Sequence, residues 1–332
     1  MLTPSNCTFL PFSWNFPILI PSLIILILGS IGNIIVIAII IKKRKKATAD
    51  LFYYLIGNLA VYDLLLLLFS LASRVIIRFT PSFGRFFLSV YNGFPILLNT
   101  GFSITMVMTA VDRFWVIICG ANSVPIESRK YLMIVFIFLV ALGYSSPVIA
   151  FSSFTSNHIQ YIQQCNTAIE VMSTCLWGLM NNPPAFIVAL MPVYIIVRYL
   201  MIHVIPLIVV VILYSRIWNN LRSQIHLAES ISHINMIKAQ KNVIIKMFIL
   251  TFIFLIACSP EYIVYLIISF DTNLSHNLCY ERYRQTLLIC QLISNSKSCI
   301  NTLIYFTLIP GFKKSLLDLL CYCRNRSSRV KN

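Results

Sequence analysis

The sequence predicts an all-α membrane protein: a bundle of seven transmembrane helices followed by a short amphipathic eighth helix. Of its 332 residues, 58% are hydrophobic. Seven apolar stretches are each long enough to cross a bilayer, for which a helix needs about 20 residues. Little of the chain remains for a separate soluble domain. We therefore expect residues 1–17 to form an N-terminal segment, 18–309 the membrane domain and 310–332 a tail.

The expected helices occupy residues 18–41, 51–77, 86–118, 131–152, 186–218, 243–270 and 286–309. The fifth stretch is over-long, so its first part is either a tilted helix or a loop along the membrane surface. After the seventh, Leu316, Leu317, Leu319 and Leu320 form a run that is typical of a helix lying in the interface. The N-terminus lacks the basic segment of a cleaved signal peptide, so the first helix is expected to act as the insertion signal.

The positions of the basic residues predict an orientation. The net charge is +16. With the N-terminus outside, residues 42–46 and the C-terminal tail put most Lys and Arg inside, whereas the outer segments carry Arg78, Arg85, Arg282 and Arg284. This asymmetry follows the positive-inside rule. Anionic lipid accounts for the basic residues, so we do not expect nucleic acid as a partner. The prediction is a multi-pass plasma-membrane protein with a cytoplasmic C-terminus.

This orientation also sorts the modification sites. Cys7, Cys165, Cys175 and Cys279 fall outside, where disulfides can form, and four cysteines allow three pairings. Asn6 and Asn273 begin glycosylation sequons on the outer side. Cys321 and Cys323 follow the amphipathic run and are candidates for S-palmitoylation; the alternative is a pair of inert cytosolic thiols.

Polar residues interrupt the apolar stretches, where they are costly and usually retained for a function. Taken with the prolines and the residues grouped with them, they are Gly32-Asn33, Leu59 to Asp63, Asp112-Arg113-Phe114, Pro206 with Tyr214, Phe254 with Pro260, the run Ser294 to Ser298, and Asn301 with Tyr305. Each has an ordinary explanation when taken alone. A single Asn can join two helices for about 0.6 kcal/mol, and a single Pro is a tolerated kink. Their occurrence together and in this order favours a signalling receptor.

On these residues the chain resembles the rhodopsin-like (class A) G-protein-coupled receptors over roughly residues 18–323. The family motifs Gly-Asn, Leu-Ala-x-x-Asp, Asp-Arg-Tyr and Asn-Pro-x-x-Tyr match Gly32-Asn33, Leu59 to Asp63, Asp112 to Phe114 and Asn301 to Tyr305, and Phe312 follows. The resemblance implies a switch that couples to a G protein, made of Asp112, Arg113, Phe114, Tyr214, Asn301 and Tyr305. Tyr214 and Tyr305 are then the alternative partners of Arg113.

The resemblance also implies a polar network in the core, to which we assign Asn33, Asp63, Lys297, Ser298 and Asn301. Many members of the family hold a sodium ion beside the carboxylate that matches Asp63. Here Phe102 stands at the helix-three position of that cavity, and Lys297 lies one turn before Asn301 on the same helix face. We therefore expect a Lys297–Asp63 bridge in place of the ion; the alternative is that Lys297 points elsewhere.

Several residues depart from the family pattern. Leu88 replaces the Cys that bridges to the second outer loop, Cys258 replaces the helix-six Trp, Thr302 replaces the Pro after Asn301, and Gln240 replaces the inner acid of helix six. The last change weakens the inactive-state latch to Arg113. Because Cys165 lacks its usual partner, we expect the pairs Cys165–Cys175 and Cys7–Cys279.

The outer half of the bundle holds the candidate ligand pocket: Arg74, Asn99, Arg198, Glu261, Tyr265, Gln291 and Asn295. Arg198 and Glu261 either pair or snorkel, or they face a peptide with charged ends. Pro95 and Ser296 stand where amine receptors carry Asp and opsins carry Lys, so neither an amine nor retinal is expected. The chain has no enzyme, metal or cofactor motif. We predict a receptor for an extracellular neuropeptide-type ligand that activates a heterotrimeric G protein; alternatives are a chemosensory receptor of the same fold or a transporter.

Overall fold

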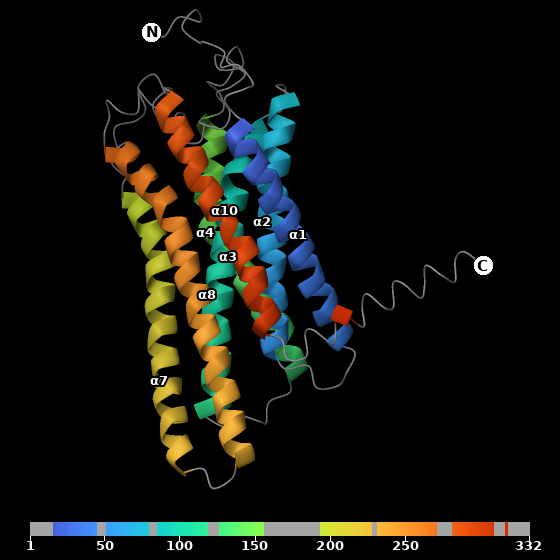
Figure 1. The fold of residues 1–332 in the computed structure, drawn as a ribbon. Coiled ribbons are helices and arrows are strands. Elements are labelled where there is room, and N and C mark those ends of the chain that lie inside the picture. Colours follow the sequence, from blue (N-terminus) through green and yellow to red (C-terminus); the bar gives the residue numbers. More distant parts are fainter. Residues whose placement is uncertain are drawn as a thin grey trace, which may run out of the picture.

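The computed structural model describes residues 16–44, 51–79, 85–118, 126–155, 193–227, 231–270, 281–308 and 316–317. Seven long helices account for nearly all of these residues (Figure 1): α1 (Phe16–Arg44), α2 (Leu51–Phe79), α3 (Arg85–Ile118), α4 (Ile126–Thr155), a fifth helix, α8 (Ile231–Phe270) and α10 (Glu281–Leu308). The fifth helix consists of residues 193–199, the π-helical turn η4 (Leu200–Val204) and α7 (Ile205–Leu227). The predicted seven-helix, all-α architecture is confirmed.

The apolar stretches located the helices but not their ends. Within the described residues, five helices are long and apolar enough to cross a membrane, and α4 adds the shorter apolar stretch Leu132–Ser146. The fifth helix continues to Leu227 and α8 begins at Ile231, past the predicted limits of 218 and 243. Both project beyond the other helices in Figure 1. A helix that leaves the membrane can continue with polar residues, which hydropathy does not detect.

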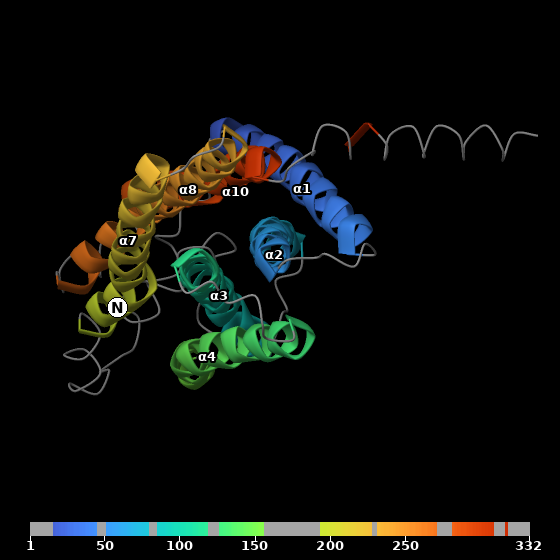
Figure 2. The same ribbon diagram turned by 90° about the horizontal axis from the view of Figure 1, so that it is seen from below.

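The helices are arranged as an arc around two inner members. Seen along the bundle in Figure 2, α2 and α3 lie in the middle, α4 packs on α3, and α1, α10, α8 and the fifth helix form the arc. The chain closes on itself through contacts between α1 and α10. We call the end where α3 terminates the Arg113 end, and the opposite end, where the fifth helix begins, the Arg198 end.

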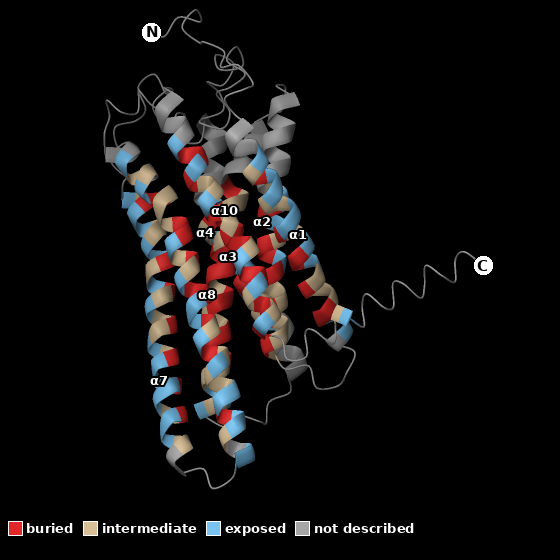
Figure 3. Ribbon diagram, viewed as in Figure 1, coloured by how far each residue is buried: buried red, intermediate tan, exposed pale blue. Residues whose placement is uncertain are grey.

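Apolar side chains cover much of the outside of the bundle and polar ones fill its centre. Leu132 is 72% exposed, whereas Asn33, Asp63, Lys297, Ser298 and Asn301 are each at most 1% exposed. Figure 3 shows buried residues along the inward helix faces and exposed residues on the outward ones. This is the distribution expected of helices surrounded by lipid, where buried polar groups must find partners inside the protein.

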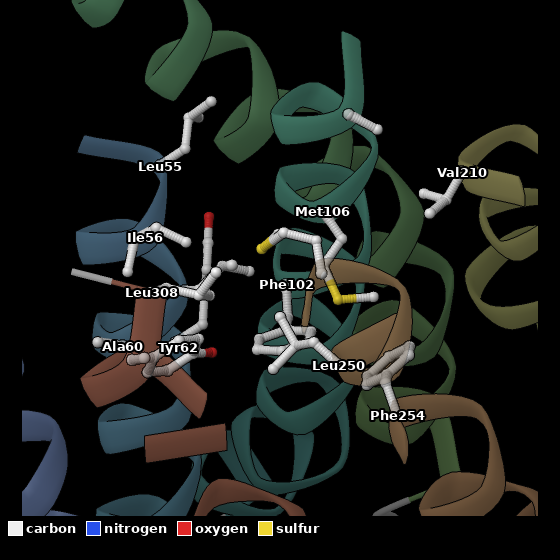
Figure 4. Close-up of a cluster of buried hydrophobic side chains, with 14 of the residues drawn as sticks. Leu55, Ile56, Ala60, Tyr62, Phe102, Met106, Val210, Leu250, Phe254 and Leu308 are labelled. Carbon is white, nitrogen blue, oxygen red and sulfur yellow. The ribbon is translucent and has the colours of Figure 1, made fainter. Parts of the chain in front are cut away.

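Below these polar groups, toward the Arg113 end, lies an apolar core. Figure 4 shows Leu55, Ile56 and Ala60 of α2, Phe102 and Met106 of α3, Val210 of α7, Leu250 and Phe254 of α8, and Leu308 of α10. Each is at most 2% exposed. The Phe102 and Phe254 rings stack at 5.0 Å between centroids and join α3 to α8. This contact places aromatic faces directly beside the polar centre.

The π-helical turn in the fifth helix follows from Pro206. Proline has no N–H, so the carbonyl of Ile202, four residues earlier, loses its usual helical donor. The Ser103 hydroxyl of α3 donates to that carbonyl at 2.5 Å instead. The backbone N–H of Ile205 donates to Leu200, five residues back. The proline therefore links the fifth helix to α3 and places His203 within a widened turn.

A close approach of α1 and α10 depends on Gly32. A Cβ atom at this position would collide with the side chain of Thr302. Thr302 is held in place because its hydroxyl donates to the Ser298 carbonyl at 2.9 Å. By contrast, a Cβ at Gly143 on α4 would have no neighbour within 4 Å.

We expect Gly32→Ala to lower the stability of the bundle by about 1–3 kcal/mol, the usual cost of overpacking a tight contact. Thermal unfolding of the purified protein, followed with a thiol-reactive dye that reports exposure of Cys258 and Cys290, measures the effect. Gly143→Ala is the matched control: it should leave the midpoint unchanged or raise it, because Ala favours helix by up to about 1 kcal/mol. Equal midpoints for the two variants would contradict the Gly32 contact.

Candidate functional site

The ion pair at the end of α3 is formed as predicted. Arg113 donates to Asp112 Oδ2 from Nε at 3.0 Å and from a terminal nitrogen at 2.6 Å. The two side chains are 14% and 7% exposed. The guanidinium carbon also lies 4.5 Å from the ring centroid of Phe52 on α2, within the range of a cation–π contact. Both interactions hold Arg113 against its own helix and α2, at the edge of the Arg113 end.

The two tyrosines expected near Arg113 have different surroundings. Tyr305 is fully buried and its hydroxyl donates to Asp63 Oδ2 at 3.1 Å. Tyr214 is 3% exposed, and its hydroxyl has no hydrogen-bond partner among the described residues. Neither tyrosine is therefore engaged with Arg113 here. The structure shows Arg113 paired with Asp112.

At the same end, α8 is tied to α10 by a lysine. Lys246 Nζ donates to the carbonyl of Thr307 at 2.9 Å, one residue before the last residue of α10. A cation near the last carbonyls of a helix satisfies an orphan acceptor and the helix dipole. Lys241 lies 4.7 Å from the Trp218 ring centroid and joins α8 to the fifth helix. These contacts connect α8 to its neighbours near the position where Gln240 replaces the family's acid.

Asp63 is the centre of one polar cluster. Its carboxylate accepts hydrogen bonds from Ser298 Oγ at 3.0 Å, Asn301 Nδ2 at 3.0 Å and Tyr305. All three donors belong to α10, so the cluster ties α2 to α10. Asn33, which the sequence also assigned to this network, is fully buried. Its amide donates to the carbonyl of Gly29 in its own helix at 2.9 Å. The structure therefore joins Ser298 and Asn301 to Asp63 directly, and not Asn33.

The predicted Lys297–Asp63 bridge is wrong. Lys297 Nζ donates to Asn99 Oδ1 at 2.6 Å and lies 3.4 Å from Cys258 Sγ. The ammonium also lies 4.6 Å from the Phe254 ring centroid and 5.6 Å from that of Phe102. The physical reason is that the Asp63 carboxylate already has three donors, while Asn99 supplies an acceptor beside two aromatic faces. Asp63 still attracts Lys297 electrostatically, at a distance longer than an ion pair.

Lys297 thus forms a second polar cluster that joins three helices. Asn99 belongs to α3, Cys258 to α8 and Lys297 to α10, and the Cys258 sulfur also contacts the Ser294 hydroxyl at 3.6 Å. A buried ammonium is costly unless its charge is stabilised. An amide oxygen, a sulfur and a ring face share that task here. The cation–π contribution is about 2 kcal/mol when the site is desolvated.

Aromatic and cationic side chains gather toward the Arg198 end. Arg198 Nε donates to the Tyr262 hydroxyl at 3.3 Å, and its guanidinium lies 4.8 Å from the Tyr262 ring centroid. The Tyr199 hydroxyl is 3.0 Å from Ser259 Oγ. His203, 2% exposed, packs against the rings of Tyr199, Tyr262 and Phe254 at 4.7–5.4 Å between centroids. This aromatic group reaches from the Arg198 end down to the Lys297 cluster.

The structure divides the seven predicted pocket residues. Asn99 belongs to the Lys297 cluster and Arg198 to the aromatic group. Glu261, Gln291 and Asn295 are half-buried on α8 and α10, and Glu261 lies within electrostatic range of Cys258 and Cys290. The side chains of Arg74 and Tyr265 lie outside the described residues.

Other predictions also fall outside the described residues. These are the disulfides of Cys7, Cys165, Cys175 and Cys279, the sequons at Asn6 and Asn273, the palmitoylation sites Cys321 and Cys323, and most of the amphipathic eighth helix. They stay predictions.

Sequence reasoning missed the aromatic partners. Phe52 under Arg113 and the Phe102–Phe254 pair beside Lys297 were not assigned a role, although Phe102 was noted as a departure from the family. The contact of Ser103 with Ile202 could have been anticipated, because Pro206 leaves that carbonyl without its helical donor. No sequence signal pointed to the grouping of Tyr199, His203 and Tyr262.

Seven helices with a polar centre and a paired Asp-Arg at the end of the third define a class of membrane receptor. The sequence model of the family '7 transmembrane receptor (rhodopsin family)' matches residues 32–305 of this chain. The protein belongs to this family, which confirms the resemblance that the motifs indicated.

Individual relatives are similar at low identity over most of their length. The G-protein coupled receptor homolog K2 of Swinepox virus (strain Kasza) is 26% identical over 98% of this chain and 83% of that protein. The neuropeptide Y receptor type 6 of Mus musculus is 24% identical over 97% of this chain and 85% of its own. The neuropeptide Y receptor type 4-2 of Homo sapiens is 23% identical over 90% of this chain and 77% of that receptor.

We expect Asn99→Leu to destabilise the protein by roughly 3–5 kcal/mol, because it removes the acceptor of a buried charge. Adding Lys297→Met to this variant should restore much of the loss, since no charge is then stranded. Thermal unfolding of the single and double variants measures both effects.

Asn58→Leu is the matched control for this experiment. Asn58 is a half-buried amide of α2, and it donates to Thr105 Oγ1 at 2.9 Å. Its loss should cost about 1 kcal/mol and should not be rescued by Lys297→Met. Two results together would show that the Asn99 contact is incorrect. In the first, Asp63→Asn restores the stability that Lys297→Met loses; in the second, Lys297→Met restores none of the stability that Asn99→Leu loses.

Proposed function

We propose that this protein is a plasma-membrane receptor that binds an extracellular peptide at the Arg198 end and activates a heterotrimeric G protein at the Arg113 end. The observation that carries the proposal is the arrangement of Arg113. Asp112 and Phe52 hold Arg113 in place. The hydroxyl of Tyr214, the expected alternative partner of Arg113, is buried and has no hydrogen-bond partner among the described residues. A side chain with two sets of partners provides a two-state switch.

The proposed mechanism is a change in population between two arrangements. In the first, Arg113 pairs with Asp112, Tyr305 donates to Asp63, and Lys246 joins α8 to the end of α10. In the second, the Arg113 ends of α8 and the fifth helix move outward and Arg113 turns toward Tyr214. A ligand shifts the balance only by the difference between its affinities for the two states. The opening would expose Arg113 and the basic segments to the G protein.

The route between the two ends passes through the Lys297 cluster. The ring centroid of Phe254 lies 4.9 Å from that of His203 on the ligand side and 5.0 Å from that of Phe102 on the other side. Lys297 contacts Phe254 and Cys258, both on α8. A ligand that displaces Tyr262 or His203 would therefore shift α8 against α3 and α10. We infer that this is how binding at the Arg198 end changes the packing at the Arg113 end.

The peptide class of ligand is supported by two kinds of observation. Relatives named as neuropeptide Y receptors are similar to this chain over nearly its whole length. The Arg198 end also carries opposite charges, Arg198 and Glu261, together with the amides of Gln291 and Asn295. A peptide offers charged and amide groups that fit such a surface.

The orientation follows from the positive-inside rule applied to the helix order. Lys42 at the end of α1 and Lys238 and Lys241 near the start of α8 lie at the Arg113 end. This end is therefore proposed to face the cytoplasm, and the N-terminus the outside. The disulfides, the two outer glycosylation sites and palmitoylation of Cys321 and Cys323 belong to the same proposal.

We expect Arg113→Ala to abolish signalling while leaving the protein at the cell surface. Loss of the guanidinium removes the group that would contact the G protein, but α3 keeps its packing. The measurement is a second-messenger assay in cells screened with a peptide library, beside cells with empty vector, with surface level quantified by an N-terminal tag.

Lys42→Ala is the control, because it removes the same charge from the Arg113 end at an exposed site of α1. It should signal like the unmodified receptor. A full response from Arg113→Ala at an equal surface level would show that Arg113 is not the coupling residue.

A further inference from the structure

Toward the Arg113 end, α8 offers cations where the family carries an acid. Gln240, which is half-buried, stands at that position. The one acidic residue within α8 is Glu261, which lies on the far side of Pro260 from this end. The half of the helix toward the Arg113 end instead carries three lysines: Lys238, Lys241 and Lys246. A carboxylate of α8 therefore cannot pair with Arg113, and another contact must hold α8 against the bundle there.

Lys246 makes such a contact. Its Nζ donates to the carbonyl of Thr307 at 2.9 Å. Because α10 ends at Leu308, this carbonyl is among the last four of the helix, which have no donor within the helix itself. A positive charge is also favoured at this end of a helix by the helix dipole. Lys246, whose side chain is half-buried, thus satisfies the end of α10 and fixes α8 to it.

The position of this contact matters for an outward movement of α8. The middle of α8 is joined to α10 through Cys258, which contacts Ser294 and Lys297. Lys246 is several turns nearer the Arg113 end, and the end of a tilting helix moves farther than its middle. An outward tilt of α8 therefore separates Lys246 from Thr307 more than it disturbs the Cys258 contacts.

The contact of Lys241 is of a different kind. Lys241 lies over the ring of Trp218 in the fifth helix, and the fifth helix moves together with α8 in the proposed mechanism. This contact can persist in both arrangements. The contact of Lys246 cannot, because α10 is held to α2 by the bonds of Ser298 and Asn301 to Asp63.

We propose that the contact between Lys246 and the Thr307 carbonyl is the latch of the resting receptor and sets the level of signalling without ligand. This inference rests on the receptor function proposed above and specifies which bond must break before the Arg113 end opens. A latch between an acid and Arg113 is thereby replaced by a latch between a cation of α8 and a backbone carbonyl of α10. The latch therefore requires a cation at position 246.

The first experiment measures the latch without signalling. Hydrogen–deuterium exchange is followed in the purified full-length protein in phosphatidylcholine nanodiscs. Lys246→Met keeps an unbranched side chain but removes the donor, so peptides from residues 238–250 and 300–308 should exchange about threefold faster or more, as expected when a hydrogen bond to a charged group is lost from the closed state. Lys246→Arg can still donate and should restore slow exchange.

Arg216→Gln is the matched control, because it removes a cation from an exposed position of the fifth helix. The same peptides should exchange as in the unmodified protein. Unchanged exchange in Lys246→Met, or equal acceleration in Lys246→Arg and Arg216→Gln, would overturn the latch.

The second experiment measures second-messenger production in cells without added ligand, normalised to the surface level of each variant. Lys246→Met should raise this basal signal about threefold or more, because losing a contact made only in the resting state shifts the population toward the other state. Lys246→Arg and Arg216→Gln should signal like the unmodified receptor. Adding Arg113→Ala to Lys246→Met should remove the increase. A basal signal from Lys246→Met that is unchanged or lower, in a receptor that shows Arg113-dependent signalling, would overturn the latch.

The two experiments separate this inference from the receptor function. Exchange does not require a G protein, so slow exchange in Lys246→Met would remove the latch and leave Arg113-dependent signalling intact. Conversely, faster exchange in Lys246→Met that Lys246→Arg reverses, without an Arg113-dependent signal in any variant, would support the contact and count against the proposed function.

Discussion

Polar groups in the middle of this bundle cannot return to water, so each must find its partner within the protein, and the packing of the helices depends on this constraint. The Ile202 carbonyl that Pro206 leaves without a helical donor is satisfied by Ser103. The carboxylate of Asp63 is satisfied by three donors from α10. In each case the satisfied group fixes the relative position of two helices. Among the described residues, the buried hydroxyl of Tyr214 has no hydrogen-bond partner, and this is the group toward which Arg113 would turn in the proposed mechanism.

The two central clusters divide this work between them. The Asp63 cluster joins α2 to α10 through neutral donors and needs no movement of α8. The Lys297 cluster joins α10 to both α3 and α8. A displacement of α8 must therefore change the surroundings of the ammonium, while α2 and α10 can stay together. In the proposed mechanism, α2 and α10 would form a fixed frame and α8 would be the moving element, which is the kind of bistable packing that a switch requires.

The sequence predicted the fold well because apolar length is a property of single segments. It predicted the Arg113–Asp112 pair and placed Asp63, Ser298 and Asn301 in one polar network, which the structure shows. It also placed Asn33 there, which instead donates to Gly29 of its own helix. It failed for Lys297, because helical spacing gives the face on which a residue lies but not which of two polar groups a long side chain reaches. The Asp63 carboxylate already accepts from three donors, whereas Asn99 supplies an acceptor beside the rings of Phe102 and Phe254. The grouping of His203 with Tyr199 and Tyr262 required the three-dimensional structure, since its members come from two helices far apart in the chain.

The departures from the family pattern depend on one another. Phe102, Cys258 and Lys297 are separate anomalies in the sequence, yet all three meet around a single ammonium group. The Cys258 sulfur lies 3.4 Å from Nζ, so the much larger indole of the family's Trp would occupy the space that the lysine now fills. The Phe102 ring stacks on Phe254 and offers the ammonium a second aromatic face. A cation can be retained at this depth only if its neighbours stabilise it and leave it room. Cys258 meets the second condition, and Asn99, Phe102 and Phe254 meet the first, so a change at any one of these positions alters what the others must do.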